Sequence, residues 1–322
     1  MFRHFKQLIL VLTFLAGLFI VMIGELPGNS LLWREAQNTA HIFAFGFLAI
    51  ISLLLVQSTS GLKKHHPAWT YPIAVIISLL AGISIELIQM GIGRDAEVHD
   101  VIRDLLGILS FLGLYAYFDP ALSRYRNQQN RRILSVAMLA SLALLIAGLI
   151  PLTNLTVSIV QRNTAFPTLI DFSQRWPSAF ITTQDAELSV VNLPVQWQHN
   201  EPQRFSRMTV YPARYPGLAL HEPVPDWSGY SALSFHVYSG ATQPFKLALR
   251  INDQQHNQEY EDRYTTSFMI MHGANQIRIP LDEIRNGPVD RKLDMQSIDK
   301  LMLFAVEPDQ PLQFYLSNFN LE

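Results

Sequence analysis

Cysteine is absent from this chain of 322 residues, and charged side chains make up only 16% of it. Without cysteine there is no disulfide framework and no thiolate metal site, so any metal would need His, Asp or Glu ligands. The net charge of −2 provides no basic surface for nucleic acid. These absences exclude disulfide-stapled scaffolds, cysteine-based zinc sites and a nucleic-acid partner.

Apolar residues are concentrated in the N-terminal half. Five stretches there are apolar over about the length that a helix needs to cross a bilayer: 7–24, 38–56, 71–91, 101–118 and 133–150. Arg3 and Lys6 precede the first stretch as in a signal peptide, but the apolar run is long and no small-residue cleavage site follows it. We therefore expect an uncleaved anchor and a bundle of about five transmembrane helices.

The connections between these stretches differ in Lys and Arg content, and basic residues near a span stay on the cytoplasmic side. The N-terminus, the second connection and the fourth connection hold Arg3, Lys6, Lys63, Lys64, Arg124, Arg126, Arg131 and Arg132. The first and third connections hold only Arg34 and Arg94. This pattern predicts a multi-pass protein of the inner (plasma) membrane with a cytoplasmic N-terminus and a periplasmic or extracellular C-terminal domain.

Beyond the fifth stretch the apolar residues change to a period of two. Alternating runs predict strands at 233–237, 245–251, 277–281, 301–305 and 314–316. Turn signals such as Asn286-Gly287-Pro288 separate them at a spacing typical of a β-sandwich. The predicted fold is an α-helical membrane bundle (1–151), a tether (152–165) and an all-β jelly-roll sandwich domain (166–322).

Polar residues gather near the expected outer ends of the helices, where they are costly and usually face a bundle interior or a cavity. They are His41, Glu86, Gln89, Arg94, Asp100 and Asp104. Ser78, Gly82 and Glu86 recur every four residues, which predicts that Glu86 points into the bundle beside a closely packed neighbour. Asp100, Asp104 and Gly107 also share one helix face. A polar pocket open to the outside is expected.

Two segments carry a family resemblance. The first is N-T-A-H-I-F-A-F at 38–45, and the second is E-L-I-Q at 86–89, followed by Arg94 and by D-x-x-x-D-x-x-G at 100–107. They resemble the VanZ-like membrane family, which has a His near the start of one span, an E-x-x-Q helix end, an Arg and a D-x-x-x-N-x-x-G helix start. Asp104 stands where the family usually has Asn, and the family's basic residue before the His is absent. The resemblance covers about 26–118 and implies no assigned reaction.

Three roles are open for these residues. They form a buried ion-pair and capping network, they bind a ligand or lipid headgroup, or they catalyse a reaction. In the third case Glu86 would be the general acid or base, and His41 or Arg94 would stabilise a phosphate or sugar leaving group. Asp100 is also expected to be the N-cap of the fourth helix. G-x-S-x-G, phosphate-loop and H-E-x-x-H motifs are absent, so enzyme activity would depend on this set alone, and no cofactor is predicted.

The C-terminal half carries a second resemblance, through D-W-S-G-Y at 226–230, G-A-N at 273–275 and F-Y-L-S-N-F at 314–319. These segments resemble galactose-binding-like jelly rolls, the fold shared by many carbohydrate-binding modules. The resemblance implies a carbohydrate ligand and a structural calcium near the first and last strands, where Asp171 or Asn318 would serve. Trp227 and Tyr230 are expected to be core and corner residues.

Sugar rings stack on exposed aromatic side chains that have hydrogen-bonding neighbours. Trp197, within Q-W-Q-H-N, is the first such candidate. The second is a polar run between two strands that contains His256, Tyr260, Asp262 and Arg263. Metal binding by Asp253, His256 and Asp262 is an alternative, as is a plain solvated loop, but the spacing matches no known metal motif. No metal site is predicted.

The two halves together predict a protein of the cell envelope whose partners are the lipid bilayer and a cell-surface glycan or glycolipid. It would bind or handle a surface glycan, glycolipid or lipid-linked precursor at the outer face of the membrane. A membrane-embedded enzyme acting on a lipid-phosphate or lipid-sugar substrate is the second possibility. A structural or assembly protein of the envelope is the third.

Overall fold

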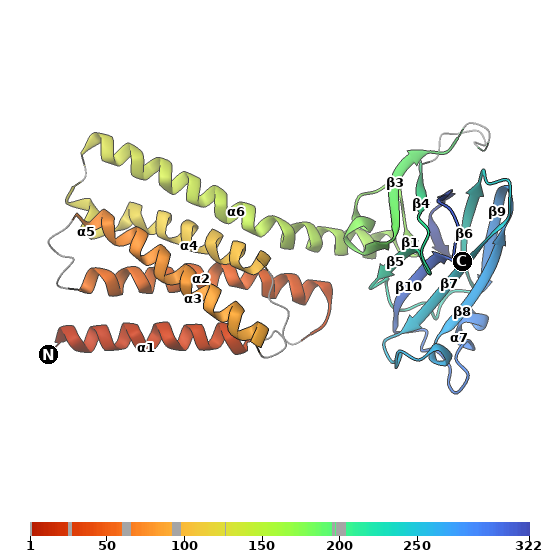
Figure 1. Cartoon of the computed structure of the whole chain (residues 1–322), viewed down its shortest axis with the longest axis horizontal. Coiled ribbons are helices and arrows are strands. Elements are labelled where there is room, and N and C mark those ends of the chain that lie inside the picture. The colour runs from red at the N-terminus through yellow and green to blue at the C-terminus, as the bar shows by residue number, and fades with distance from the viewer. Residues whose placement is uncertain are drawn as a thin grey trace. The chain divides into compact units, whose positions relative to one another are not determined.

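The structure is a computed structural model that describes residues 2–24, 28–59, 66–91, 98–125, 127–194, 197 and 204–322. The chain divides into two compact units, Met1–Leu155 and Thr156–Glu322. The first unit is helical and the second consists mainly of β-strands (Figure 1).

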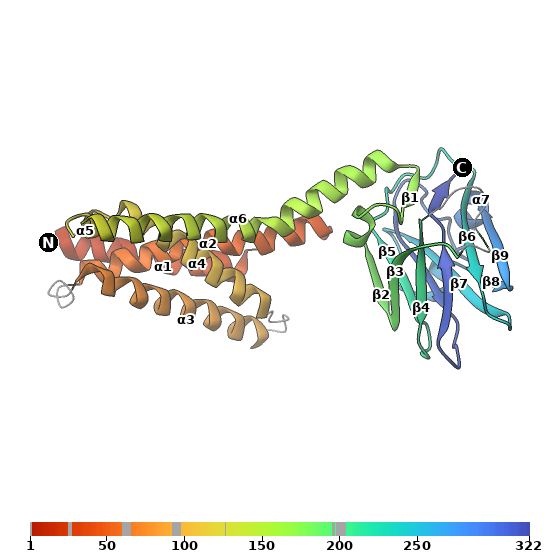
Figure 2. The same ribbon diagram turned by 90° about the horizontal axis from the view of Figure 1, so that it is seen from above.

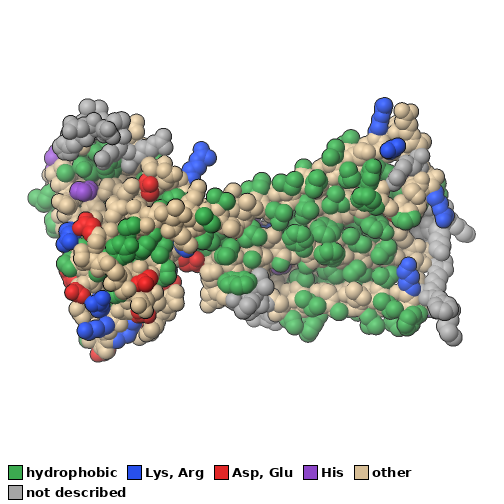
Figure 3. Space-filling model, turned by 180° about the vertical axis from the view of Figure 1, so that it is seen from behind, with side chains coloured by type: hydrophobic (Ala, Val, Ile, Leu, Met, Phe, Trp, Pro, Cys, Tyr) green, Lys and Arg blue, Asp and Glu red, His purple; other side chains and the backbone are tan. Residues whose placement is uncertain are grey.

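The α-helices of the first unit are α1 (Phe2–Ile23), α2 (Leu31–Ser58), α3 (Thr70–Gly91), α4 (Val98–Phe118), α5 (Pro120–Ser123) and α6 (Gln128–Ala165). Among the described residues, all of these except the short α5 are long and apolar enough to cross a membrane, and the five predicted spans are confirmed as helices. The long helices run alongside one another (Figure 2). Apolar side chains cover the outside of this unit, and Lys and Arg side chains gather at one end of it (Figure 3).

The helix ends differ from the sequence expectation in three places. α2 begins at Leu31, seven residues before the predicted 38, because the Ser30 side chain caps it by accepting a hydrogen bond from the backbone N–H of Trp33 at 3.3 Å. The expected N-cap role of Asp100 is wrong, since α4 begins at Val98 and Asp100 lies in its first turn. A carboxylate there still stabilises the helix N-terminus. The predicted tether (152–165) is helical, as the continuation of α6.

Close approach between α2 and α4 organises the core of the bundle. Gly107 of α4 lies against the carbonyl oxygen of Ile42, and Gly46 of α2 lies against the ring of Phe111. α3 joins them through a buried hydrogen bond of 3.0 Å between the hydroxyls of Ser78 and Ser52. Small residues therefore set the helix spacing, as in other membrane bundles.

The strands of the second unit are β1 (Thr168–Ile170), β2 (Ile181–Gln184), β3 (Ala186–Asn192), β4 (Arg204–Val210), β5 (Gly217–His221), β6 (Ala232–Ser239), β7 (Phe245–Asp253), β8 (Tyr264–Ile270), β9 (Gly273–Pro280), β10 (Ile298–Ala305), β11 (Leu312–Leu316) and β12 (Phe319–Leu321). The five predicted strands are confirmed as β6, β7, β9, β10 and β11. Leu281, expected at the end of a strand, instead begins the short helix α7 (Leu281–Arg285).

The described strands form a seven-stranded and a five-stranded sheet. The first has the order β1-β12-β6-β11-β4-β3, with β9 also paired to β6, and the second has the order β2-β5-β10-β7-β8. Every pairing is antiparallel. The predicted fold class, a helical bundle followed by a jelly-roll β-sandwich, is confirmed.

Aromatic side chains fill the sandwich. Phe235 and Phe319 stack with ring centroids 4.2 Å apart, and Phe245 contacts Phe314 of the other sheet with centroids 5.5 Å apart. Trp227 is fully buried, and its indole N–H donates to the carbonyl of Val224 at 2.8 Å. The predicted core role of Trp227 is confirmed.

Residues near the start of the second unit form hydrogen bonds with other parts of that unit. The Asn318 amide donates to the Asp171 carboxylate at 3.1 Å and accepts from the backbone N–H of Phe172 at 3.0 Å. In the last turn of α6, Arg162 donates to the carbonyl of Glu222 and lies 4.7 Å above the ring of Phe180. The first residues of this unit are therefore attached to its sheets.

We expect Gly107→Ala to destabilise the helical bundle by about 3 kcal/mol, since its methyl group must push α4 away from the Ile42 carbonyl. Gly91→Ala is the matched control, because an added Cβ there meets no atom within 4 Å and alanine favours helix. Thermal unfolding of the two purified variants in detergent checks this. Equal melting temperatures would contradict the close approach.

Candidate functional site: a groove on the five-stranded sheet

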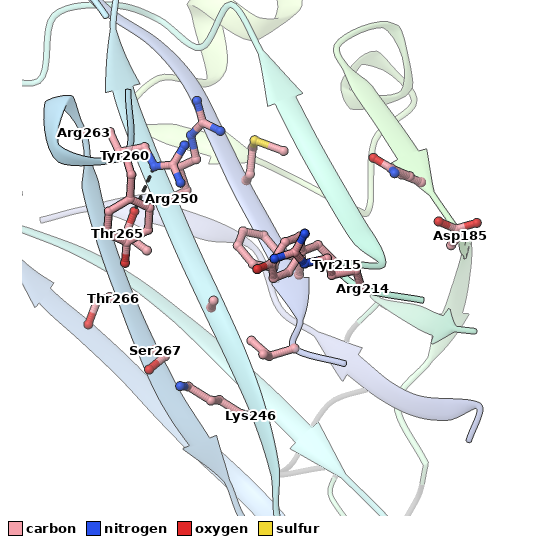
Figure 4. Close-up of a pocket in the computed structure, with 15 residues that line it drawn as sticks. Asp185, Arg214, Tyr215, Lys246, Arg250, Tyr260, Arg263, Thr265, Thr266 and Ser267 are labelled. Carbon is pink, nitrogen blue, oxygen red and sulfur yellow. Dashed lines mark hydrogen bonds between the residues drawn. The ribbon is translucent and has the colours of Figure 1, made fainter. Parts of the chain in front are cut away.

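The outer face of the five-stranded sheet carries a groove (Figure 4). Successive side chains of a strand point to opposite faces of its sheet. In β10, Leu301 and Leu303 are buried inside the sandwich, so Met302 and Phe304 face outward and line the groove.

Strand β7 forms the centre of the groove floor. Leu247 and Leu249 are fully buried, and the residues between and beside them face outward. Lys246, Ala248 and Arg250 thus line the groove in a row. Because Ala248 is small, it leaves open space between two cationic side chains.

Hydroxyl groups from β8 lie beside this row. Ser267 is paired with Ala248, and Thr265 with Arg250, across the antiparallel register. The Thr265 hydroxyl accepts a hydrogen bond of 3.3 Å from Nε of Arg263, drawn as a dashed line in Figure 4. The floor therefore presents hydroxyl and cationic groups over an apolar base.

Tyr215 lies on one side of the groove. The residue is 47% exposed, and its ring packs edge-on against Phe304, with centroids 5.3 Å apart and planes at 70°. The guanidinium of Arg214 lies 5.2 Å from the centre of the Tyr215 ring. Phe304 below and Arg214 beside it hold this exposed ring in place.

Tyr260 lies on the other side of the groove, on the connection between β7 and β8 (Figure 4). The residue is 66% exposed, and the guanidinium of Arg263 lies 4.7 Å from the centre of its ring. Two exposed tyrosines, each with a neighbouring arginine, therefore border the same groove.

The groove has a volume of about 760 Å³, within the usual range for ligand sites. Its lining residues are Gln184, Asp185, Arg214, Tyr215, Lys246, Ala248, Arg250, Tyr260, Arg263, Thr265, Thr266, Ser267, Met302, Phe304 and Val306. Aromatic rings offer apolar faces, and the amide, hydroxyl and guanidinium groups offer hydrogen bonds. The arrangement can hold flat rings that are rich in hydroxyl groups.

An ion-pair network anchors the connection that carries Tyr260 and Arg263. The Asp253 side chain is fully buried and accepts two hydrogen bonds from Arg291, at 2.6 and 2.7 Å, and one from the backbone of Asp294 at 2.8 Å. The same guanidinium donates from Nε to Asp262. Arg291 thus ties both ends of the connection to one point.

These contacts shift the ionisation of all three partners. Hydrogen bonds from Arg291 and from the backbone of Asn257 lower the pKa of Asp262 to about 2. Burial opposes ionisation of Asp253, but its hydrogen bonds from Arg291 and Asp294 outweigh burial and lower its pKa. The two carboxylates in turn raise the pKa of Arg291.

His256 forms a hydrogen bond with Arg250, one of the residues that line the groove. Its Nε2 lies 2.9 Å from a guanidinium nitrogen of Arg250, which can only donate, so Nε2 accepts and the ring proton is on Nδ1. Nδ1 then donates to the carbonyl of Asp262 at 2.8 Å. Asp253, Asp262 and His256, the alternative metal ligands, are thus engaged with arginines and backbone. In the described parts of the chain, no group of three His, Asp or Glu residues is arranged to hold a metal.

Trp197 lies away from this groove, on the seven-stranded sheet. Its half-buried ring contacts Tyr238 of β6 and Tyr315 of β11, with centroids 6.0 and 5.7 Å apart. The structure therefore separates the two predicted sugar-binding candidates. Of the residues predicted from the sequence, Tyr260 and Arg263 line the groove, and His256 and Asp262 support them.

The predicted polar set of the helical unit is partly brought together. Nδ1 of His41 on α2 lies 3.1 Å from Oδ1 of Asp104 on α4. Glu86 of α3, only 6% exposed, is close enough to interact electrostatically with both. Asp100 pairs with Arg103, one turn away, at 2.5 Å. Gln89 lies half-buried near the end of α3, and Arg94 is outside the described residues.

Asp104 has one oxygen without a hydrogen-bond partner among the described residues. The side chain is 1% exposed, and its Oδ2 lies 2.7 Å from the position of a Cβ on Gly82 of α3. Gly82 therefore gives the Asp104 carboxylate, which also contacts His41, the space to lie between α3 and α4. Ser78, Gly82 and Glu86 are all buried, which confirms the prediction that they share an inward-facing side of α3.

A third buried carboxylate of the helical unit, Asp119, was not predicted as a site. It is 1% exposed and accepts hydrogen bonds from the Gln57 amide at 2.9 Å, the Tyr71 hydroxyl at 2.8 Å and the Ala121 backbone at 2.8 Å. Both of its oxygens are engaged, which is the arrangement expected of a structural group. Asp119 therefore differs from Asp104, whose Oδ2 has no hydrogen-bond partner in the described part of the chain.

The groove residues that the sequence did not suggest come from separated segments. They are Arg214, Tyr215, Lys246, Arg250 and Phe304. Lys246, Arg250 and Phe304 occupy alternate positions of strands that were predicted, so their outward direction could have been read from the period of two. The convergence of those strands with Tyr215 could not.

Comparison with protein-family models finds no match for the chain. Comparison with curated proteins also finds none. Among solved structures, a family 11 carbohydrate-binding module from Clostridium thermocellum, in complex with a β-1,3-1,4-mixed-linked tetrasaccharide, is 19% identical with a TM-score of 0.36. That match covers 48% of this chain and 93% of the module.

Two further solved structures are similar over the same part of the chain. An exo-β-agarase is 19% identical with a TM-score of 0.39, and the match covers 48% of this chain and 25% of the agarase. A family 30 carbohydrate-binding module of a Clostridium thermocellum cellulase is 15% identical with a TM-score of 0.34, covering 44% of this chain and 90% of the module. The jelly-roll assignment rests on the strand order above.

We expect Arg291→Gln to destabilise the β-sandwich by about 3 kcal/mol at neutral pH, because buried Asp253 loses its charged partner. The carboxylates have pKa values below their usual 3.8, so their stabilisation is present above about pH 4 and is lost as the pH falls toward 2. The difference in melting temperature between wild type and variant should therefore narrow below pH 4. A difference that stays constant from pH 6 to pH 2.5 would contradict the network.

Proposed function

We propose that this protein is a multi-pass membrane protein that binds a glycan in the groove of its β-sandwich. The observation that carries the proposal is the pair of exposed tyrosines, Tyr215 and Tyr260, on opposite sides of one groove. Sugar rings present apolar C–H faces that stack on aromatic side chains, and their hydroxyl groups need hydrogen-bond partners at the edges. The groove offers both.

The floor matches the length and chemistry of an oligosaccharide. Outward-facing residues follow β7 from Lys246 to Arg250, a distance of about 13 Å at the usual rise per residue. Thr265 and Ser267 follow β8 in parallel with this row. A groove with hydrogen-bonding groups spread over that length fits a chain of sugars better than a single compact ligand.

The helical unit supports a place in the cell envelope. The described basic residues Lys6, Arg124, Arg131 and Arg132 lie near the helix ends that also contain Ser58 and Asp119, and His41 and Asp104 lie in the opposite halves of α2 and α4. With basic residues retained in the cytoplasm, the β-sandwich would be periplasmic or extracellular, where glycans are displayed. The VanZ-like resemblance of 26–118 agrees with an envelope protein.

We expect Tyr260→Ala and Tyr215→Ala each to weaken glycan binding about tenfold, since each removes one stacking surface. The measurement is calorimetric titration of the full chain in detergent. The ligands are a mixed-linkage β-glucan tetrasaccharide, an agarose tetrasaccharide and tetragalacturonate. Tyr211→Ala is the matched control, because this exposed tyrosine does not line the groove.

Trp197→Ala separates the groove from the other candidate surface. If the glycan binds in the groove, we expect this variant to keep wild-type affinity, because Trp197 contacts the seven-stranded sheet. Loss of binding in Trp197→Ala with retention in Tyr260→Ala would move the site to that sheet. Absence of binding to every ligand in a broad glycan array would overturn the proposal.

A second candidate function is action of the helical unit on a lipid-linked substrate. The observation that favours it is the buried Oδ2 of Asp104 beside His41 and Glu86, which has no hydrogen-bond partner among the described residues, since unsatisfied buried polar atoms are rare in purely structural networks. Asp119, with both oxygens engaged, shows the structural arrangement within the same bundle.

Asp104→Asn tests this second function. The amide oxygen keeps the contact with His41 and the NH₂ group replaces the unpartnered oxygen, so we expect a melting temperature within a few degrees of wild type. Asp119→Asn should cost about 2 kcal/mol, because donors face both of its oxygens and the NH₂ group would meet a donor in either orientation. If the cluster works on a substrate, cells carrying Asp104→Asn lose the surface glycan of the wild type at normal protein level. If cells carrying Asp104→Asn instead show as much surface glycan as wild-type cells, the cluster has only a packing role.

A further inference from the structure

The charge of the groove is opposite to that of the unit that contains it. Residues 156–322 contain more Asp and Glu than Lys and Arg. The groove lining nevertheless has four basic side chains, Arg214, Lys246, Arg250 and Arg263, and one acidic side chain, Asp185. Positive charge is thus concentrated at one place on an otherwise acidic domain, which attracts anions to that place.

The groove cations also differ in their partners from other arginines of the domain. Arg278, Arg285 and Arg291 each form an ion pair with a carboxylate at 3.0 Å or less. Within the described residues, Lys246, Arg250 and Arg263 form none. Arg214 is 3.9 Å from Glu307 in a pair whose side chains are mostly exposed, so that pair is weak.

Arg250 and Arg263 lie close to each other without a charge between them. Burial lowers the pKa of Arg250, and the neighbouring charge of Arg263 lowers it further. The partner of Arg250 is Nε2 of His256, which accepts the hydrogen bond as a neutral group, and Nε of Arg250 has no partner among the described residues. An anion in the groove would relieve this repulsion.

The cations are spread along the groove rather than gathered at one point. Lys246 and Arg250 lie four residues apart on the same face of β7, about 13 Å from Cα to Cα. Arg263 lies beside Arg250, and Lys246 lies toward the other end of the floor (Figure 4). A ligand with one terminal phosphate would reach one end only, whereas a chain with repeated charges would reach both.

We infer that the ligand of this groove is an anionic glycan, a chain whose sugars carry carboxylate or sulfate groups at intervals. The inference rests on the proposed glycan-binding function and narrows it to one ligand class. Tyr215 and Tyr260 contact the sugar faces, and Lys246, Arg250 and Arg263 contact the charged substituents.

Matched ligands test the charge. Tetragalacturonate and its methyl ester share one sugar chain and differ in the carboxylates, and a sulfated carrageenan tetrasaccharide is compared with a nearly neutral agarose tetrasaccharide. For the full chain in detergent, we expect the better-fitting anionic ligand to bind at least tenfold more tightly than its neutral counterpart. The preference should fall as salt rises from 0.05 to 0.5 M, because salt screens the ionic contacts. Which pair shows the larger ratio distinguishes carboxylate from sulfate.

Variants of the groove cations test the site. Lys246→Met and Arg263→Gln should each weaken binding of the preferred anionic ligand about threefold, and the double variant about tenfold, with less than a twofold effect on the neutral ligand. Lys292→Met is the matched control, because this exposed lysine lies outside the groove lining. Melting temperatures equal to wild type show that the variants remain folded.

The outcomes separate this inference from the function on which it rests. Equal or tighter binding of the neutral ligands, with Tyr260→Ala still weakening it, overturns the anionic ligand and keeps the glycan site. Binding of neither charged nor neutral glycans overturns both. A single-stranded oligonucleotide serves as a non-sugar polyanion, and tighter binding of the oligonucleotide than of any glycan also overturns the inference.

Discussion

Leu247, Leu249 and Ile251 are fully buried between the two sheets, and the arrangement of the groove depends on that burial. Side chains alternate across a strand, so placing these three inside forces Lys246 and Arg250 outward. A one-residue shift in the pairing of β7 would exchange the two sets and place cations in the core. The hydrophobic interior therefore determines which polar groups reach the groove.

The rim of the groove depends on a different interaction. Tyr260 and Arg263 lie in the connection between β7 and β8, in and next to a short 3-10 helix (Tyr260–Asp262), where no strand pairing holds them. Arg291 supplies the missing constraint by binding buried Asp253 and Asp262 at the two ends of that connection. The groove thus combines a floor held by hydrophobic packing with a rim held by ion pairs.

The helical unit contains polar groups inside an apolar bundle. Gly107 lets α2 and α4 approach closely, and Gly82 of α3 leaves room for Asp104. Asp119 shows that this bundle can satisfy both oxygens of a buried carboxylate. Since Oδ2 of Asp104 has no hydrogen-bond partner among the residues that the structure describes, this is a feature of its site and not a general limitation of the fold.

The sequence by itself determined the two-part architecture, because apolar runs long enough to cross a membrane and a period of two are local patterns. It also identified His41, Glu86 and Asp104 through their cost in an apolar span, and Tyr260 and Arg263 through their polar loop. Only the tertiary structure decided that His41 pairs with Asp104, and that Trp197 and Tyr260 lie on different sheets. It alone brought Tyr215 to the same groove as Tyr260. Those outcomes depend on strand order and helix packing between residues far apart in the chain, which no local pattern encodes.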